Sequence, residues 1–203
     1  MKKIITISRQ YASGGRTIGK QVAEKLGVKL YDSEIIKDTM RKTGLSEQLI
    51  TSAEQRATNS FLFNLVMGVD EAHNRIKQIE KAEHELIQSY VDEGPCVIVG
   101  RTANFILNRK DTFNIFIYSD MEKRIKYAIE HYGIDKSQAQ RMIEKSDRER
   151  RMYAANFYGK EWGNKDNYEM MLNSGLVGID RCVKLICEAA GDTVEDSEED
   201  TVE

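Results

Sequence analysis

Short apolar runs alternate with stretches of helical spacing along most of this chain. Continuous runs such as 96–100 and 113–118 are typical of strands that are buried on both faces of a sheet. Together with shorter runs they predict five strands, at 2–7, 29–32, 96–100, 113–118 and 168–172. Because helical stretches separate these strands, the pattern indicates an α/β fold with a five-stranded parallel sheet.

The stretches between the runs predict helices. Ile18, Val22 and Leu26 recur every four residues and give the first helix one apolar face. Further helices are predicted at 32–44, 76–93, 121–131, 137–158 and 176–186. The apolar face of the last helix is predicted to consist of Leu176, Ile179, Val183 and Ile186. Residues 45–93 are helical in pattern and too long for a simple crossover, so we expect an inserted helical lobe besides the crossover helix.

A glycine-rich turn, SGGR at 13–16, joins the first strand to the first helix. The backbone N–H groups of such a turn and the positive end of the following helix form a cradle for phosphate. The usual sequence of this cradle is GxxxxGK followed by Ser or Thr. Here Gln10 replaces the first glycine and Arg16 replaces the lysine, whereas Gly15 and the Mg²⁺-binding hydroxyl of Thr17 are kept. The alternative is a Gly-Gly turn without a ligand.

Composition bounds the class of protein. A chain of 203 residues, 40% apolar and 31% charged, suits one domain with an inserted lobe. Its apolar runs are much shorter than the ~18 residues of a membrane helix, so we expect no membrane association. The three cysteines are odd in number and lack zinc-type spacing, which predicts buried thiols in a reducing cytoplasm.

The charge is unevenly distributed. The net charge is −3, but residues 191–203 contain seven acidic side chains and no apolar periodicity, so this tail is predicted to be disordered. Without those seven acids the remaining chain has a net charge of +4. A mildly basic body suits a small anionic substrate and is too weakly charged to indicate nucleic-acid binding.

Arginines recur where the predicted strands end. The carboxyl ends of parallel strands form the ligand-binding edge of such a sheet. Arg16 lies on the glycine turn, and Arg101 directly follows a strand and a glycine, which points it into the cleft. Arg148, Arg150 and Arg151 crowd the charged helix at 137–158. Phosphoryl transfer requires alignment and charge neutralisation, which arginine forks provide.

Some of these residues also fit simpler roles. Asp147, Arg150 and Arg151 are spaced to form an ion-pair cluster on a solvated helix face, and by themselves they favour that interpretation. By the same reasoning Arg124 is more typical of a surface residue. Asp32 either caps the next helix or reaches a magnesium-bound water, and the sequence favours neither interpretation over the other.

The chain resembles the cytidylate kinase-like family, relatives of the bacterial cytidylate kinases, over residues 2–190. The segments that carry the resemblance are SGGR at 13–16, YDSEII at 31–36, VIVGR at 97–101, DRERR at 147–151 and LNS at 172–174. The resemblance implies a three-layer P-loop NTPase fold with ATP and Mg²⁺ as donor and metal.

The resemblance also assigns roles to individual positions. Arg101 matches the arginine that binds the acceptor phosphate in cytidylate kinases, and Asp147 and Arg150 match the D-x-x-R element of their lid. Thr102 stands where those enzymes have an aspartate, and Ile143 stands where they have a further lid arginine. Recognition of CMP is therefore less strongly implied than the fold and ATP.

We therefore predict a cytoplasmic, ATP- and Mg²⁺-dependent phosphotransferase acting on a nucleoside monophosphate, CMP or dCMP first. Residues 1–190 would form the kinase domain, with the acceptor-binding lobe at 45–93, a lid at 135–165 and the tail at 191–203. The alternatives are a kinase of another small metabolite and a nucleotide sensor without turnover. Oligomeric state stays open.

The predicted site residues fall into four groups. The catalytic group is Arg16, Arg101, Arg150 and Arg151. The ATP-binding group is Ser13, Gly14, Gly15, Arg16, Thr17 and Arg148. The acceptor-binding group is Asp32, Ser33, Arg101, Asp147 and Arg150. The metal-binding group is Thr17 and Asp32.

Overall fold

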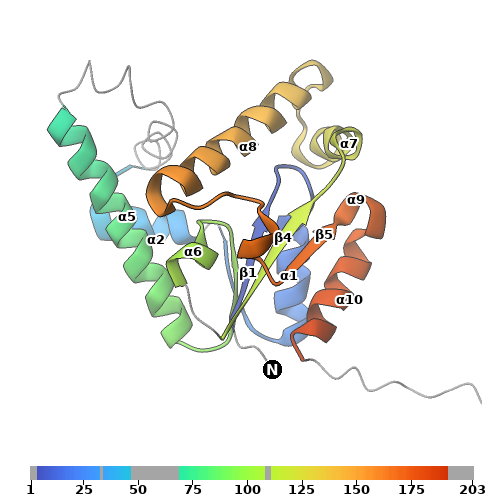
Figure 1. The fold of residues 1–203 in the computed structure, drawn as a ribbon, viewed down its shortest axis with the longest axis horizontal. Coiled ribbons are helices and arrows are strands. Elements are labelled where there is room, and N and C mark those ends of the chain that lie inside the picture. The colour runs from blue at the N-terminus through green and yellow to red at the C-terminus, as the bar shows by residue number, and fades with distance from the viewer. Residues whose placement is uncertain (1–3, 33, 47–68, 108–110, 192–203) are drawn as a thin grey trace, which may run out of the picture.

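Five parallel strands form the centre of the protein, in the order β2-β3-β1-β4-β5 (Figure 1). The computed structural model describes residues 4–32, 34–46, 69–107 and 111–191. The strands are β1 (Ile4–Arg9), β2 (Lys29–Tyr31), β3 (Cys96–Val99), β4 (Thr112–Tyr118) and β5 (Met170–Asn173). The predicted five-stranded parallel sheet is confirmed.

Strand β1 lies in the middle of the sheet and pairs with both β3 and β4. Its alternate side chains enter different cores. Ile5 and Ile7 pack into one apolar cluster, while Ile4 packs into another on the opposite face. Burial of both faces explains why the strands read as continuous apolar runs rather than as an alternating pattern.

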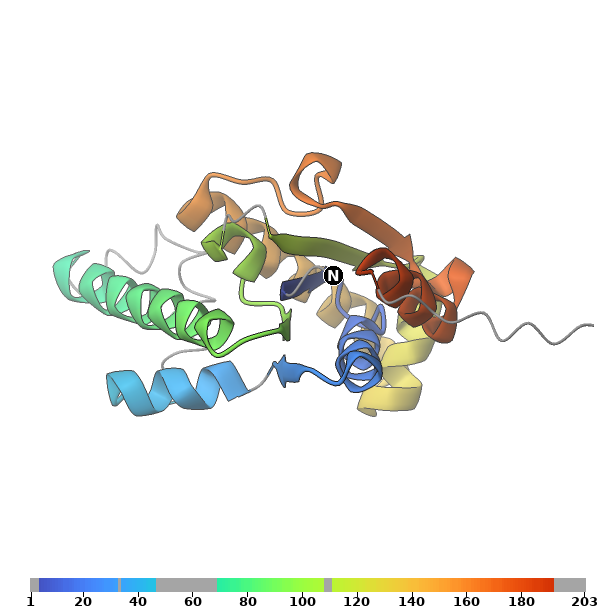
Figure 2. The same cartoon turned by 90° about the horizontal axis from the view of Figure 1, so that it is seen from below.

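Helices cover both faces of the sheet and complete the predicted three layers (Figures 1 and 2). On the first face α1 (Gly15–Leu26) packs beside α10 (Ile179–Ala189), and their apolar side chains share one cluster with the strands. On the other face lie α2 (Glu34–Thr43), α5 (Val69–Asp92) and α6 (Ala103–Leu107). The helix α6 was not predicted from the sequence.

The helix α8 (Lys136–Tyr158) crosses the carboxyl end of the sheet and follows α7 (Met121–Tyr132) (Figure 1). The carboxylate of Asp135 begins α8 by accepting the Ser137 N–H at 2.8 Å. A short 3₁₀ helix, η1 (Lys165–Asn167), then leads into β5. Most of the predicted lid is thus one continuous helix above the ligand-binding edge.

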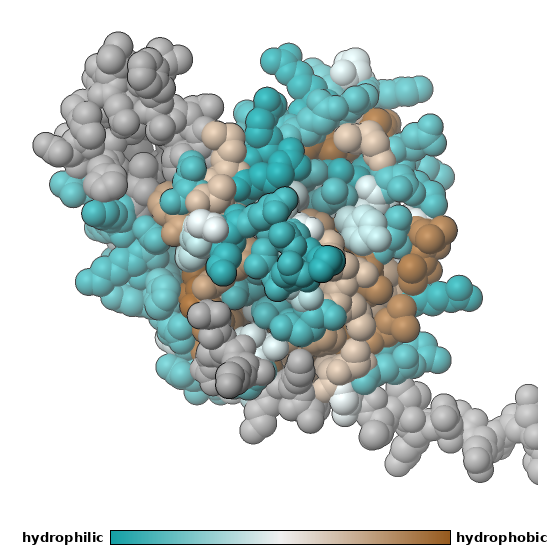
Figure 3. Space-filling view, viewed as in Figure 1, coloured by the Kyte–Doolittle hydropathy of each residue, from teal (hydrophilic) through white to brown (hydrophobic). Residues whose placement is uncertain are grey.

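The predicted last helix is wrong in one respect. It is two helices, α9 (Ser174–Val177) and α10, separated by Gly178 at a φ of 88°. Because this left-handed residue changes the chain direction, Leu176 does not continue the apolar face of α10 and is 77% exposed. Figure 3 shows hydrophobic residues reaching the surface where α9 and α10 lie.

The predicted burial of the cysteines is confirmed. All three cysteines are buried free thiols. Within the described ranges no helix is long and apolar enough to cross a membrane. Residues 47–68 of the predicted lobe, Ser33 and the tail from 192 onward lie outside them. The domain, lobe and lid boundaries stay predictions.

Candidate functional site

A cavity of about 530 Å³ opens at the carboxyl ends of β1, β2 and β3, beneath α8. Its walls are the loop after β1 (8–16), the turn after β3 (99–102), Asp32 and one side of α8. This is the edge of the sheet at which the sequence predicted a ligand site. The outer surface of α8 above it is mostly hydrophilic (Figure 3).

The loop after β1 has the geometry of a phosphate cradle. Gly14 adopts a left-handed φ of 75° directly before α1, and as the N-cap residue it provides no side-chain cap for this helix end. Uncapped N–H groups at a helix N-terminus form a ready anion site. The Ser13 hydroxyl donates to the carbonyls of Gln10 (2.9 Å) and Ile117 (3.2 Å), so it shapes the loop rather than facing a ligand.

Gln10, which departs from the usual glycine, ties this loop to the end of β4. Its side-chain oxygen accepts the Ser119 N–H at 3.0 Å. A second support comes from Ser174, whose hydroxyl donates to the Ser13 carbonyl at 2.6 Å and to the Tyr118 carbonyl at 3.1 Å. A glycine at position 10 would lack the first of these contacts and keep the second.

Arg16, in the place of the usual lysine, forms an ion pair with Asp32. Both residues line the cavity, one from α1 and the other from the end of β2. The Thr17 hydroxyl instead lies 2.8 Å from that of Tyr127, outside the cavity wall. Asp32 is therefore placed to reach a ligand, whereas Thr17 must first leave Tyr127.

Arg101 reaches the cavity from the turn after β3, where it adopts a positive φ of 54°. Its guanidinium pairs with Glu83 of α5 at 3.0 Å, and the Tyr153 hydroxyl of α8 donates to the same carboxylate at 3.2 Å. Burial lowers the pKa of Arg101 to about 10. Burial also raises the pKa of Glu83 to about 7, and the Tyr153 hydrogen bond opposes that rise.

Sequence reasoning missed Glu83, although its position carries a signal. Ile79, Glu83 and Ile87 are spaced by four residues on one face of α5, and all three are buried. A single acid on an apolar helical stripe indicates a buried partner of opposite charge. Glu83 is 1% exposed and positions Arg101 from behind the cavity.

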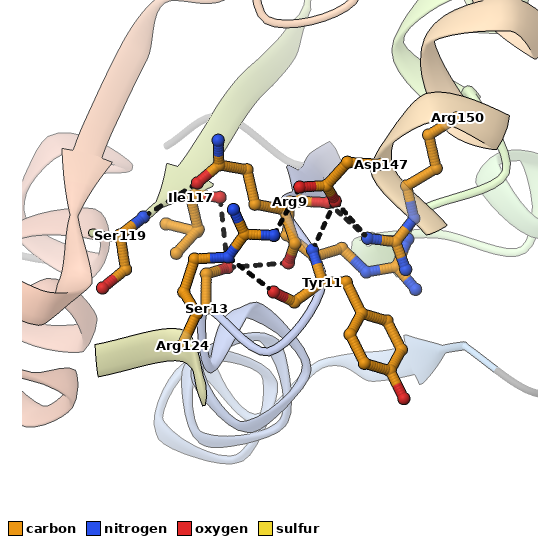
Figure 4. Close-up of polar contacts among 9 residues, drawn as sticks. Arg9, Tyr11, Ser13, Ile117, Ser119, Arg124, Asp147 and Arg150 are labelled. Carbon is orange, nitrogen blue, oxygen red and sulfur yellow. Dashed lines mark hydrogen bonds and ion pairs between the residues drawn. The ribbon is translucent and has the colours of Figure 1, made fainter. Parts of the chain in front are cut away.

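Asp147 and Arg124 form a buried ion pair beneath the loop (Figure 4). Asp147 accepts the Tyr11 N–H at 2.8 Å, and Arg124 Nε donates to the Tyr11 carbonyl at 2.8 Å. Arg124 and Asp147 are each only 4% exposed. The interpretations of Arg124 as a surface residue and of Asp147 as part of a solvated cluster are therefore wrong.

The three arginines of α8 separate into two groups. Arg150 lines the cavity and donates to the Arg9 carbonyl at 3.0 Å. Arg148 and Arg151 are exposed and lie outside the cavity wall. Residues three apart share a helix face, so these two point the same way while Arg150 points inward. Burial lowers the pKa of Arg150 to about 9, and the nearby charge of Arg9 adds to this.

Arg9 is a second residue of the site that sequence reasoning did not select. It is the last residue of β1, half-buried, and part of the cavity wall. Burial lowers the pKa of its guanidinium. Its place at a strand end was visible in the sequence, but the direction of its side chain was not.

Comparison with known proteins gives consistent results. A model of the cytidylate kinase-like family matches residues 4–176. Proteins named cytidylate kinase from Archaeoglobus fulgidus and Pyrococcus horikoshii are each 26% identical to this chain. The first match covers 91% of this chain and 93% of the relative, and the second covers 85% and 80%. An uncharacterized protein from Eubacterium ventriosum has the same fold, with a TM-score of 0.68, 24% identity, and coverage of 92% of this chain and 97% of that one.

Proposed function

This chain belongs to the cytidylate kinase-like family, and on that premise we propose that it is an ATP-dependent nucleoside monophosphate kinase. The family indicates a P-loop kinase of nucleotides or other small molecules. The observation that carries the proposal is one cavity with a phosphate cradle on one wall and the guanidiniums of Arg101 and Arg150 on the others. CMP and dCMP are the first acceptors to test, because two relatives are named cytidylate kinases.

On the donor side, the amides of Gly14 and Gly15 at the start of α1 would hold the phosphates of ATP. Arg16 would add positive charge beside them. Among the described residues no cluster of three or more His, Cys, Asp or Glu side chains is placed to hold a metal. A nucleotide-bound Mg²⁺ fits this site, because Mg²⁺ keeps waters and phosphate oxygens as most of its ligands.

Thr17 and Asp32 are the residues that would hold that ion. Asp32 already lines the cavity. Thr17 lies in the first turn of α1 and directly follows Arg16, the last residue of the glycine-rich turn. The metal would supply charge neutralisation to the transferring phosphate group. The residues of the chain would align the donor and acceptor and exclude water.

On the acceptor side, Arg101 and Arg150 would bind the phosphate that receives the new group. A phosphate acceptor is already deprotonated, so the reaction requires no general base and depends on alignment and electrostatics. Arg151 and Arg148 would act only if α8 moves, because both now point away from the cavity. Their predicted roles at the transferring group and the donor stay proposals.

A second acceptor class is favoured by Ile143. This residue stands where cytidylate kinases carry a lid arginine, and here it is fully buried in an apolar cluster with Ala12 and Ala128. Its backbone position cannot present a side chain to a nucleotide without disrupting that cluster. A kinase acting on a different small phosphorylated metabolite therefore remains the alternative.

The test is ADP release from Mg²⁺ and ATP across a panel of nucleoside monophosphates and small metabolites. Turnover with CMP or dCMP supports the proposal, and turnover with another metabolite alone supports the second acceptor class. Binding of ATP by calorimetry without any turnover would indicate a nucleotide sensor. Gly15→Val serves as the site control, because a Cβ there lies 2.5 Å from the Arg9 Cβ and should abolish ATP binding. Absence of ATP binding by the unaltered protein would contradict all three functions.

A further inference from the structure

Arg9 occupies the centre of the ligand-binding edge. It ends β1, the middle strand, and is in register with Ile117 of β4. Its carbonyl accepts a hydrogen bond from Arg150, so the backbone of the strand end and the side chain of α8 meet here (Figure 4). Its own side chain forms part of the cavity wall.

Two glycines from different segments leave room for this side chain. A Cβ on Gly15 would lie 2.5 Å from Arg9 Cβ and 2.8 Å from its Cγ. A Cβ on Gly100 would lie 2.8 Å from the Arg9 guanidinium carbon. The stem of Arg9 therefore runs past the phosphate cradle, and its guanidinium lies against the turn that carries Arg101. A side chain at either glycine would displace it.

The arginines around the cavity differ in whether an acidic side chain pairs with them. Arg16 is paired with Asp32, Arg101 with Glu83 and Arg124 with Asp147. Of these pairs, Arg124 and Asp147 lie outside the cavity wall, and Glu149 on the wall lies 3.8 Å from Lys145.

Two guanidiniums are left without full compensation. Arg9 forms no side-chain hydrogen bond or ion pair with any described residue. Among the described acidic residues Arg150 contacts Asp147 alone, at 3.5 Å, and Arg124 already pairs with that carboxylate. The charge of Arg9 also lowers the pKa of Arg101 and of Arg150, which shows mutual repulsion across the cavity. Two incompletely compensated guanidiniums that line one cavity match one phosphate dianion.

We propose that Arg9 is a substrate-binding residue that, together with Arg150, holds a phosphate dianion in this cavity. The inference rests on the proposed kinase function and adds a residue to its site. Arg9 supplies positive charge that is not fully compensated, whereas the charge of Arg16 is paired with Asp32. Because its guanidinium lies against Gly100 rather than at the cradle, the bound dianion is the phosphate monoester of the acceptor. The phosphate chain of ATP is the other source of the same chemistry.

The test compares Arg9→Gln and Arg9→Lys with the unaltered protein, using calorimetry with inorganic phosphate, CMP and ATP as separate probes. Arg181→Gln is the matched control, since Arg181 is exposed on α10 and is not part of the cavity wall. Loss of one charge-assisted contact should weaken phosphate and CMP binding by about 10- to 100-fold in Arg9→Gln. Arg9→Lys should recover part of the affinity, because lysine keeps the charge but lacks the fork.

Thermal unfolding of the ligand-free proteins separates a binding role from a structural one. A half-buried charge that lacks a partner destabilises the folded state, so Arg9→Gln should melt at the same temperature as the unaltered protein or higher. A purely structural Arg9 would lower the melting temperature and leave the affinity of the folded protein unchanged. That result would overturn the inference.

The remaining outcomes are also distinct. Weaker ATP binding with unchanged phosphate-monoester binding would support Arg9 as a phosphate ligand and assign it to the donor. Equal binding of every probe by Arg9→Gln would overturn the inference and leave the kinase function standing. If the unaltered protein binds neither ATP nor a monoester, the proposed function itself fails.

Discussion

Arg124→Met should be the most destabilising single change near the loop. The guanidinium of Arg124 pairs with the Asp147 carboxylate and donates to the Tyr11 carbonyl at 2.8 Å, all within the protein interior. Methionine keeps much of the apolar stem of arginine and removes only the charged fork. The variant would leave Asp147 as a buried carboxylate without its main partner.

The structure sets the size of the effect. Breaking a buried ion pair by removing one partner costs ~3–5 kcal/mol. The Asp147 carboxylate would keep the Tyr11 N–H at 2.8 Å and the Arg150 contact at 3.5 Å, so we expect the lower part of that range. For a chain of this size ~3 kcal/mol corresponds to a fall in melting temperature of about 6–12 °C.

Urea and thermal unfolding followed by circular dichroism measure this change. The double variant Arg124→Met with Asp147→Leu should be more stable than Arg124→Met alone, because no uncompensated charge remains buried. Lys126→Met on the exposed face of α7 is the matched control and should change stability by less than ~0.5 kcal/mol. If Arg124→Met melts within about 1 °C of the unaltered protein, the pair does not hold the loop as argued.

Three further changes test other parts of the structure. The pKa of Glu83 is raised from 4.5 to about 7, so the folded protein holds this proton more strongly than the unfolded chain does. The free energy of unfolding should therefore fall as the pH rises from 4.5 to about 7. Glu83→Gln should flatten that fall, and an unchanged pH profile would contradict it. Tyr127→Phe should free the Thr17 hydroxyl and tighten Mg²⁺-ATP binding by about 2- to 5-fold in calorimetry; weaker binding would show instead that Tyr127 supports the site. In urea unfolding, Leu176→Ser should cost less than ~0.5 kcal/mol and Ile186→Ala ~2–5 kcal/mol, and equal losses would restore the single-helix prediction.

The sheet and its ligand edge were determined by local pattern alone. Apolar runs such as that of β3 are buried on both faces, and a parallel sheet covered by helices provides that environment. The glycine turn before α1 requires a positive φ, which glycine adopts readily, and Gly14 has a φ of 75°. Arg101 was placed in the cavity because a residue after a strand and a glycine emerges at the carboxyl edge.

Tertiary structure decided which charged residues are buried, which line the cavity and which are exposed. Asp147, Arg150 and Arg151 have the spacing of a solvated cluster, yet packing of α8 against the loop buries the first, turns the second into the cavity and leaves the third outside. Sequence spacing tells which side chains share a helix face, but not which face meets the protein. Arg124 acquired its partner only through the packing of α7 on α8.

The same reason explains Arg9 and Glu83. The sequence does not distinguish a charged residue in water from one beside an opposite charge. A hydropathy pattern records only the usual environment of each residue type. The burial of Glu83 and the room made for Arg9 by Gly15 and Gly100 depend on segments distant in sequence. The sequence thus determined at which edge of the sheet the cavity would form, and the fold determined which charged side chains line it.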